Sequence, residues 1–572
     1  MRRWALLAAA LAAGVATGTR AQIAPLVPDG SPSAVVLHRS DWLLQEPFSV
    51  EELLRWIAGV GMARSGALGS PEIVEMAGST NGRVELVVDG VDVSEPDYSW
   101  PRLVPVQVGM IDSIEVVRTT DPARIAIWTR RVPGTAPVAD LDLARGELGT
   151  RTRRAQLFTP PRALEVALCY EELLREADDF RPGPEEVLAE ADLGEYTGRT
   201  LLARIGLRRG DDALRIEYLE RLEESHGSVA AQLDRTRTEH TRTGLRWERP
   251  LGAAHMFLDL GHQAWRRWTR VDAVDRDPSD ARTHAALDIA IPTLGGWNPW
   301  VRFRHAITTG DATLPEARNA SFTQQRGEIQ LSRPGSVRLD LWGGAARDAR
   351  LGTTWEARGR ATLRRGPFEL GADCGRGVGY AGWDESGVER VRTGRFGAVR
   401  ARLQDASWHL EIEAFGKDLD GGSSASRLVV GAGQGPTRIG GALVQLAWRR
   451  SRGPWEMHVS STYGWTPYLR GDAAGRPRVD ARFDVRASRR LRGDDLVVTV
   501  LTTWMLDDDR PFPGSTIPRS ALGDATLDLQ FLERLSFFAG LRNITDADVA
   551  TFPGAVLPDR LGWFGVRARL LD

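Results

Sequence analysis

The residues that could perform catalysis or hold a metal ion are scattered along this chain. Its nine histidines include no pair at helical or strand spacing with a carboxylate, the arrangement that a metal centre needs. Cys169 and Cys374 are the only cysteines, too few for a disulfide-rich scaffold. Cys169 lies opposite the apolar face of the alternating segment 164–170, where an inert thiol is expected rather than a nucleophile. We therefore predict no catalytic residue, no metal ligand and no cofactor, and hence no enzymatic activity.

Charged side chains do recur with a regular spacing. In residues 478–488 every second residue is charged or polar and the intervening ones are apolar. On a strand this spacing places all the charges on one face. One interpretation of that face is a solvated wall that hydrogen-bonds to a neighbouring domain; the other is a selectivity surface for an anionic ligand. The acidic segment 176–197 is likewise interpreted as solvated surface, although it is long enough to contact a ligand. The polar face of the first segment consists of Arg478, Asp480, Arg482, Asp484, Arg486 and Ser488.

The same alternation continues from about residue 137 to the C-terminus. Residues 408–414 and 525–531 are two further examples. An apolar face against lipid and a charged face against a wet lumen are typical of transmembrane β-barrels. A soluble β-sandwich also alternates, but many of these segments run for ten or more residues, longer than the usual strand of about five to six. No later segment has eighteen consecutive apolar residues, so a membrane span must be made of strands.

The links between these segments predict the size of the barrel. Short links alternate with longer polar ones, as in outer-membrane barrels, whose short turns are periplasmic. Ten short turns join twenty strands, and a first and a last strand bring the total to about 22. A barrel of that size needs a plugged lumen. Six tryptophans beside the short turns are expected at the membrane interface. They are Trp247, Trp297, Trp300, Trp408, Trp448 and Trp455.

A small α/β domain is predicted ahead of the barrel, over residues 34–131. Ser49 is expected to cap a helix that ends before Gly59, with Glu52 as its capping-box partner. Asp89 and Gly90 lie between two β-branched runs, a strong signal for a hairpin. Further strands are expected at 34–37, 111–118 and 124–129.

The N-terminus has the features of a secretory signal peptide. Arg2 and Arg3 precede an apolar run over residues 4–15, and small residues follow up to Ala21. We therefore expect residues 1–21 to be removed on export, leaving a short extension, 22–33, ahead of the α/β domain.

Three motifs of the N-terminal domain resemble those of TonB-dependent outer-membrane receptors. Residues 53–60 match the Leu-Leu-x-x-x-x-Gly-Val helix of their plug domains, 87–91 match the strand that ends in Asp-Gly-Val, and 111–116 match Ile-x-x-Ile-Glu-Val. Near the C-terminus, residues 541–546 resemble the Arg-Asn-Leu-Thr-Asp motif of the family, and 558–560 stand where Pro-Gly-Arg opens its final strand.

This resemblance implies a plug, residues 34–135, inside a transmembrane barrel, residues 137–572, in the cell outer membrane. In that family the outer loops and the plug bind a scarce solute, such as a siderophore, cobalamin or an oligosaccharide. TonB then pulls on the plug, and the solute passes. The implied partners are the lipid bilayer, TonB and a small-molecule solute, and no nucleic acid.

Two departures from the family pattern support an alternative. Residues 118–123 run almost directly into the strand at 124–129, so the plug looks trimmed. The TonB box would have to lie within 22–33, where Pro25 and Pro28 disfavour strand pairing; the chain also ends on Asp572 rather than an aromatic residue. The alternative is a plugged barrel uncoupled from TonB, with a partner-binding or structural role. A second alternative, an outer-membrane enzyme, predicts a nucleophile and a base converging at the barrel mouth.

Overall fold

The computed structural model describes residues 34–571 with internal gaps. The gaps are 44–46, 48, 58, 65–71, 77–78, 81–83, 95–105, 121, 131–135, 148, 161–162, 177–180, 183–194, 229–232, 272–273, 277–278, 311–319, 349–351, 379–392, 420–436, 471–476, 492–495, 508–509, 513–514, 518–519, 532–533, 547–549, 553–554 and 557–559. The predicted signal peptide and the 22–33 extension lie outside the described residues.

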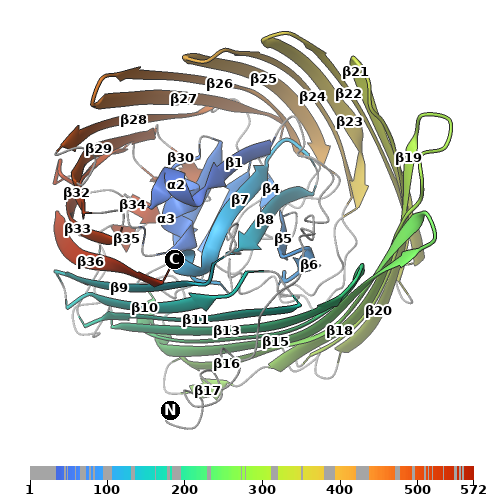
Figure 1. Ribbon diagram of the computed structural model, residues 1–572, viewed down its shortest axis with the longest axis horizontal. Coiled ribbons are helices and arrows are strands. Elements are labelled where there is room, and N and C mark those ends of the chain that lie inside the picture. Colours follow the sequence, from blue (N-terminus) through green and yellow to red (C-terminus); the bar gives the residue numbers. More distant parts are fainter. Residues whose placement is uncertain are drawn as a thin grey trace.

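A closed antiparallel barrel surrounds the N-terminal domain (Figure 1). Its 22 strands confirm the predicted number, and a short strand, β17 (Val274–Arg276), adds a pairing at the end of β16. The last strand, β36, pairs with the first, β9, and so closes the barrel, with Arg567 opposite Asp142 at this seam. The strands are β9 (Val138–Gly146), β10 (Arg151–Phe158), β11 (Leu164–Arg175), β13 (Tyr196–Arg209), β14 (Asp212–Ser228), β15 (Leu233–Leu251), β16 (Ala254–Val271), β18 (Ser279–Ala290), β19 (Asn298–Gly310), β20 (Ala320–Arg333), β21 (Val337–Asp348), β22 (Gly352–Arg365), β23 (Phe368–Val378), β24 (Thr393–Gln404), β25 (Trp408–Leu419), β26 (Thr437–Arg452), β27 (Trp455–Arg470), β28 (Pro477–Leu491), β29 (Leu496–Asp507), β32 (Ser520–Phe531), β33 (Leu535–Arg542) and β36 (Leu561–Leu571).

All ten predicted short turns fall between successive strands of the barrel. The links at the other end are less uniform than predicted. Between β14 and β15 only residues 229–232 remain of the predicted link 223–235, because both strands continue into its polar residues. The sequence pattern predicts long links at 381–390 and 417–436, and residues 379–392 and 420–436 lie outside the described residues, between β23 and β24 and between β25 and β26.

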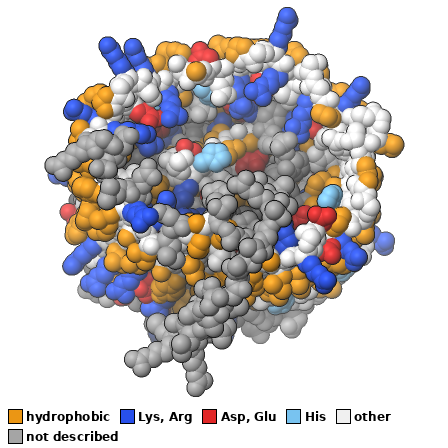
Figure 2. Space-filling view, viewed as in Figure 1, with side chains coloured by type: hydrophobic (Ala, Val, Ile, Leu, Met, Phe, Trp, Pro, Cys, Tyr) orange, Lys and Arg blue, Asp and Glu red, His pale blue; other side chains and the backbone are white. Residues whose placement is uncertain are grey.

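Alternation along the strands separates an apolar outer face from a charged inner face, as predicted. On β13, the outward Ile205 and Leu207 are 41% and 53% exposed, whereas the inward Arg204, next to Ile205, is completely buried. Apolar side chains also cover much of the barrel rim in the space-filling view (Figure 2). Because apolar surface of this extent is unfavourable in water, the outer face is suited to lipid.

The tryptophans beside the short turns were predicted to lie on the outer face, and Trp300 is an exception. Trp408 and Trp455 are about half exposed on the outer face, as an interfacial girdle requires. The girdle prediction is wrong for Trp300. It shares the inward face of β19 with Arg302 and stacks on Phe257, with their ring centroids 5.9 Å apart. The position of Trp300 in the alternation of β19 decides the direction of its side chain, and its nearness to a short turn does not.

The N-terminal domain is built on a five-stranded sheet inside the barrel (Figure 1). The strand order is β1-β7-β8-β5-β6, and only the β5–β8 pair is parallel. Val, Ile, Leu and Met side chains of this sheet and of helix α3 form one buried core with inward apolar residues of the barrel, such as Phe158 and Leu219. The elements are β1 (Ala34–His38), α2 (Arg39–Trp42), α3 (Val50–Arg55), β2 (Val60–Arg64), β3 (Glu72–Met76), β4 (Ser79–Thr80), β5 (Val84–Val88), β6 (Val91–Asp92), β7 (Ile111–Val117) and β8 (Ala123–Thr129).

Helix α3 begins as predicted but uses its glutamate differently. The Ser49 hydroxyl accepts a hydrogen bond from the backbone N–H of Glu52, at 3.3 Å, which satisfies one of the donors that the first helical turn leaves free. The Glu52 carboxylate reaches Arg542 on β33, at 2.6 Å. Glu52, which was expected to complete a capping box, therefore joins the helix to the barrel wall.

Two small sheets lie between the barrel strands and the N-terminal domain. Strands β12 (Arg181–Pro182), β35 (Ala555–Val556) and β34 (Ala550–Phe552) pair, and β34 packs against β2. Strands β30 (Arg510–Phe512) and β31 (Ser515–Ile517) form a separate hairpin. Among the described helices, none has the length and apolar character needed to cross a membrane.

Candidate functional site: the interface between plug and barrel

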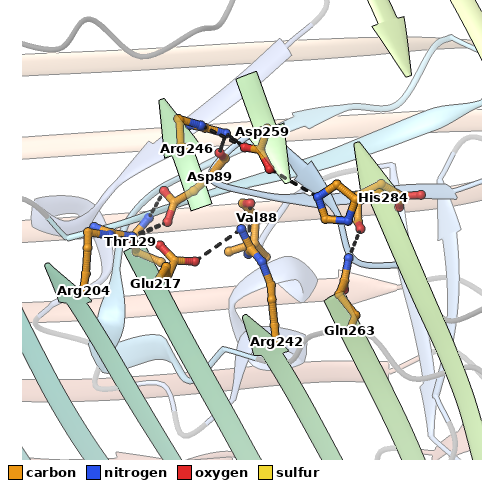
Figure 3. A network of polar contacts seen from close by, with 11 residues as sticks. Val88, Asp89, Thr129, Arg204, Glu217, Arg242, Arg246, Asp259, Gln263 and His284 are labelled. Carbon is orange, nitrogen blue, oxygen red and sulfur yellow. Dashed lines mark hydrogen bonds and ion pairs between the residues drawn. The ribbon is translucent and has the colours of Figure 1, made fainter. Parts of the chain in front are cut away.

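The β5–β6 turn is one of the points where the N-terminal domain, hereafter the plug, is held by buried charges. Asp89 and Gly90 have φ values of 50° and 87°, the left-handed conformation at both positions that a two-residue hairpin turn needs. This tight turn directs the Asp89 carboxylate and the neighbouring carbonyls towards the barrel wall (Figure 3). The predicted hairpin is therefore also a contact with the barrel.

Asp89 is fixed from both sides. Its carboxylate accepts hydrogen bonds from the backbone N–H and the hydroxyl of Thr129, at 3.1 and 2.5 Å, within the plug. From β13, Arg204 donates to the same carboxylate at 2.6 Å and to Glu217 on β14 at 2.8 Å. Arg204 is completely buried. A buried guanidinium between two carboxylates is stable only while its partners remain in place, because an isolated buried charge is costly.

Backbone carbonyls of the same turn accept further hydrogen bonds from the wall. Arg242 and Arg246 on β15 donate to the carbonyls of Val88 and Asp89, at 3.4 and 3.0 Å. Gln263 on β16 donates to the carbonyl of Asp92 at 2.8 Å. The turn is thus attached to several adjacent strands, and Figure 3 shows these side chains converging on it.

A second contact uses Lys417 on β25, the only lysine of the chain. Its ammonium group donates to the carbonyls of Met76 and Arg118, at 3.2 and 2.5 Å, and to the Ser79 hydroxyl at 2.9 Å. Glu413, four residues earlier on the same inward face, lies 3.8 Å from the Arg118 guanidinium. These contacts join the β3–β4 and β7–β8 regions of the plug to one barrel strand.

A cleft adjoins the first contact. It lies between the β5–β6 turn and strands β15 to β20, and contains about 750 Å³ of space not occupied by atoms, including open solvent. Ion pairs line it: Arg282 holds Asp92 at 2.8 Å, and Asp259 lies between Arg246 at 2.7 Å and His284 at 3.2 Å. Ion pairs therefore border the cleft, and Arg246 and Asp92 belong both to it and to the contacts that hold the turn.

The residues singled out from the sequence lie in different surroundings. Arg482 faces inward and donates to the carbonyl of Arg55 in the plug, at 2.5 Å, the contact with a neighbouring domain that one interpretation expected. The side chains of Arg478 and Asp480 lie outside the described part of the chain, as does most of segment 176–197. Cys169 is buried and Cys374 is exposed. Among the described residues, no group of three potential ligands could hold a metal ion.

The sequence did not reveal the residues that hold the plug. Arg204, Arg246 and Lys417 look like any other inward charge of an alternating strand. Only for Lys417 does a signal exist, since it is the sole lysine among 74 basic residues and its NH₃⁺ group can donate in three directions.

Comparisons with known proteins agree with this architecture. Residues 29–126 match the family described as the TonB-dependent Receptor Plug Domain. A siderophore receptor from Acinetobacter baumannii superposes with a TM-score of 0.76 at 12% identity, covering 94% of this chain and 98% of the other. An iron transporter from Neisseria meningitidis gives 0.75 at 9% identity, with 94% and 99% covered. A variant of the ferric enterobactin receptor from Pseudomonas aeruginosa gives 0.74 at 12% identity, with 94% and 98% covered. Among curated proteins, no sequence matches.

Proposed function

Since the chain combines a TonB-dependent receptor plug with the closed 22-strand barrel of such receptors, we propose that it imports a scarce solute across the outer membrane with TonB-type energy coupling. The chain would act by binding, and no covalent chemistry is part of the proposal. Its partners would be the lipid of the outer membrane, the solute and TonB.

The observation that carries the proposal is the buried attachment of the plug. Arg204 and Lys417 hold the plug from opposite parts of the wall, and both are almost completely buried. Removing one partner from such a pair typically costs about 3–5 kcal/mol, so several pairs together make spontaneous displacement of the plug rare. A solute too large for an open pore can pass only if energy from outside moves the plug. This requirement favours coupling to an energy source.

We propose an iron chelate as the first solute to test, ahead of cobalamin and oligosaccharides. The support is that the three similar structures are named for a siderophore, for iron and for ferric enterobactin. The identities of 9–12% mean that the likeness concerns the fold, and function depends on sites carried by the fold.

The uncoupled alternative has one observation in its favour. The link between β7 and β8 spans only residues 118–122, which agrees with the trimmed plug expected from the sequence. In this alternative the barrel keeps its plug permanently and serves as a binding or structural protein.

Uptake measurements distinguish the two proposals. The chain is expressed in a host that lacks its own receptors, with and without TonB, and accumulation of labelled ferric siderophores, cobalamin and oligosaccharides is followed. Uptake that needs both TonB and the proton gradient supports the receptor. Absence of uptake from a correctly inserted barrel, together with no binding of TonB to a peptide covering residues 22–45, supports the uncoupled barrel.

A further inference from the structure

An arginine-rich row crosses the outer face of strands β23 to β26. Arg376 on β23 lies directly opposite Arg395 on β24, Arg395 lies opposite Asp418 on β25, and Asp418 lies opposite Arg438 on β26. These four residues, here called the arginine row, stand at the ends of the strands that adjoin the long links 379–392 and 420–436. The row is therefore on the side of the barrel opposite to the short turns.

Alternation places the arginine row on the lipid-facing side of the barrel. Arg395 shares the outward face of β24 with Val399, which is 55% exposed, and Asp418 shares that of β25 with Ile412, which is 47% exposed. Arg395 is four positions along the strand from Val399, a distance of about 13 Å. The row therefore lies just beyond the apolar band, where lipid headgroups begin.

Trp355 on β22 marks this level independently. Its outward side chain is 57% exposed, and the guanidinium of Arg376 lies 4.6 Å from the centre of its ring. Exposed tryptophans of membrane proteins prefer the interface between the acyl chains and the headgroups. The cation–π contact also restrains Arg376, so that its remaining donors are held at the headgroup level.

The arginine row carries an excess of positive charge among the described residues. Its three guanidinium groups share one carboxylate, and Asp418 is paired with Arg438 at 3.3 Å. Arg376 and Arg395 remain directly opposite each other, an arrangement of like charges that destabilises a sheet unless an anion lies between them. A phosphate between the two strands would offset this repulsion, because guanidinium groups bind phosphate oxygens through paired hydrogen bonds.

A sector on the other side of the barrel has two exposed arginines that are both paired with a carboxylate. On β10, β11 and β13, Arg153 and Arg199 lie on either side of Glu172 and are paired with it at 3.3 and 3.0 Å. These arginines are also exposed on the outer face, at 62% and 53%. Arginine at this level is thus not by itself unusual. The difference is that three guanidinium groups, those of Arg376, Arg395 and Arg438, have the single carboxylate of Asp418 among them within the described residues of the row.

We propose that the arginine row binds the phosphate of a phosphorylated glycolipid headgroup, of the lipid A type, in the outer leaflet of the membrane. The lipid phosphate would lie between Arg376 and Arg395, and Trp355 would contact the upper end of the acyl chains. This proposal needs only the placement of the barrel in a membrane, and it stands whether or not the plug is coupled to TonB.

The first test measures lipid A retained by the full-length protein after extraction from outer membranes in mild detergent. The variant R376Q/R395Q/R438Q is compared with R153Q/R199Q, which removes the two exposed arginines that are paired with Glu172. Because each basic residue at a membrane surface contributes about 1 kcal/mol to anionic lipid binding, retention should fall about tenfold or more in the first variant. The control should keep the wild-type amount. Equal loss in both variants, or in neither, overturns the proposal.

The second test identifies the group that is bound. Purified wild-type protein is mixed with bisphosphorylated lipid A, with dephosphorylated lipid A or with inorganic phosphate, and its melting temperature is measured. Stabilisation by the phosphorylated lipid alone, lost in R376Q/R395Q/R438Q, supports the proposal. Equal stabilisation by the dephosphorylated lipid or by inorganic phosphate overturns the proposal. It is also overturned if the variant differs from the wild-type protein in oligomeric state and not in lipid content. Heat-modifiable gel mobility establishes that each variant is folded, and R395Q alone should shift retention in the same direction.

Discussion

Asp89 and Arg204 are 115 residues apart in the sequence, yet their side chains meet at 2.6 Å inside the barrel. One belongs to a turn of the plug and the other to a strand of the wall. Arg204 also binds Glu217 at 2.8 Å, so a single guanidinium holds two carboxylates together. The consequence is that Arg204 governs both the seating of the plug and the stability of the wall around it.

Replacing Arg204 by methionine should loosen the plug strongly. The substitution leaves Asp89 and Glu217 buried without their shared cation, for which we expect a loss of about 3–5 kcal/mol. Denaturant unfolding of the purified protein, followed by hydrogen exchange in β5 and β8, measures the change. In R204M/D89N/E217Q, which also removes both carboxylate charges, part of the loss should be recovered. A loss below about 1 kcal/mol, the value for an exposed pair such as Arg153–Glu172, would contradict this expectation.

Replacing Lys417 by methionine should release the plug near β3, β4 and β7. Two backbone carbonyls and the Ser79 hydroxyl lose their donor, and each buried unsatisfied group costs about 1–3 kcal/mol. The expected result is faster hydrogen exchange in those strands and greater sensitivity of cells to bulky antibiotics. Lys417→Arg keeps the charge and should retain most of the protection. If the methionine variant is as impermeable as wild type, Lys417 does not hold the plug.

Gly90→Ala should destabilise the plug hairpin. A residue with a Cβ atom pays about 1–2 kcal/mol in the left-handed conformation, and the new methyl group would lie 3.4 Å from Arg246 Nη2. The matched control is Gly252→Ala in the β15–β16 turn, where φ is 63° and nothing lies within 4 Å of the added atom. Both variants should lose stability in thermal unfolding, but only Gly90→Ala should alter hydrogen exchange at Asp89. Equal exchange in both would mean that the turn is not rigidly held.

The turn between β24 and β25 should show a simple dependence on pH. Backbone N–H groups of Ser407 and Trp408 donate to Asp405 at 2.6 and 2.7 Å, and these bonds lower the pKa of its carboxyl group below the usual value. Because the folded pKa is depressed, the stabilisation is present above the unfolded pKa, near 3.9, and disappears as the pH falls through the folded pKa. Carbon NMR titration of Asp405 in the detergent-solubilised protein measures it. An unshifted titration would show that the turn does not bind the carboxylate.

The sequence predicted the architecture well because the alternation of apolar and polar residues, and the residues that form turns, are properties of short segments. Alternation gave the faces of the strands, ten short turns gave their number, and Asp89-Gly90 gave the hairpin. The positions of Arg204 and Lys417 could not be predicted, since alternation fixes the face of a side chain but not which barrel strand lies beside which part of the plug. Strands β2 to β4 were missed because their short segments lack a clear period. Trp300 was assigned to the wrong face because nearness to a turn was used where alternation was decisive.

The seam of the barrel constrains how the chain assembles. Arg567 on the last strand lies opposite Asp142 on the first and also donates to the carbonyl of Leu43 in the plug, at 3.2 Å. Leu43 and Asp142 are both made long before Arg567, so this junction is among the last contacts that synthesis makes possible. Pairings of such long sequence separation form slowly. Because Arg567 lies opposite β9 and also contacts the plug, closure of the cylinder and seating of the plug depend on the same side chain, and the last strand to be made completes both.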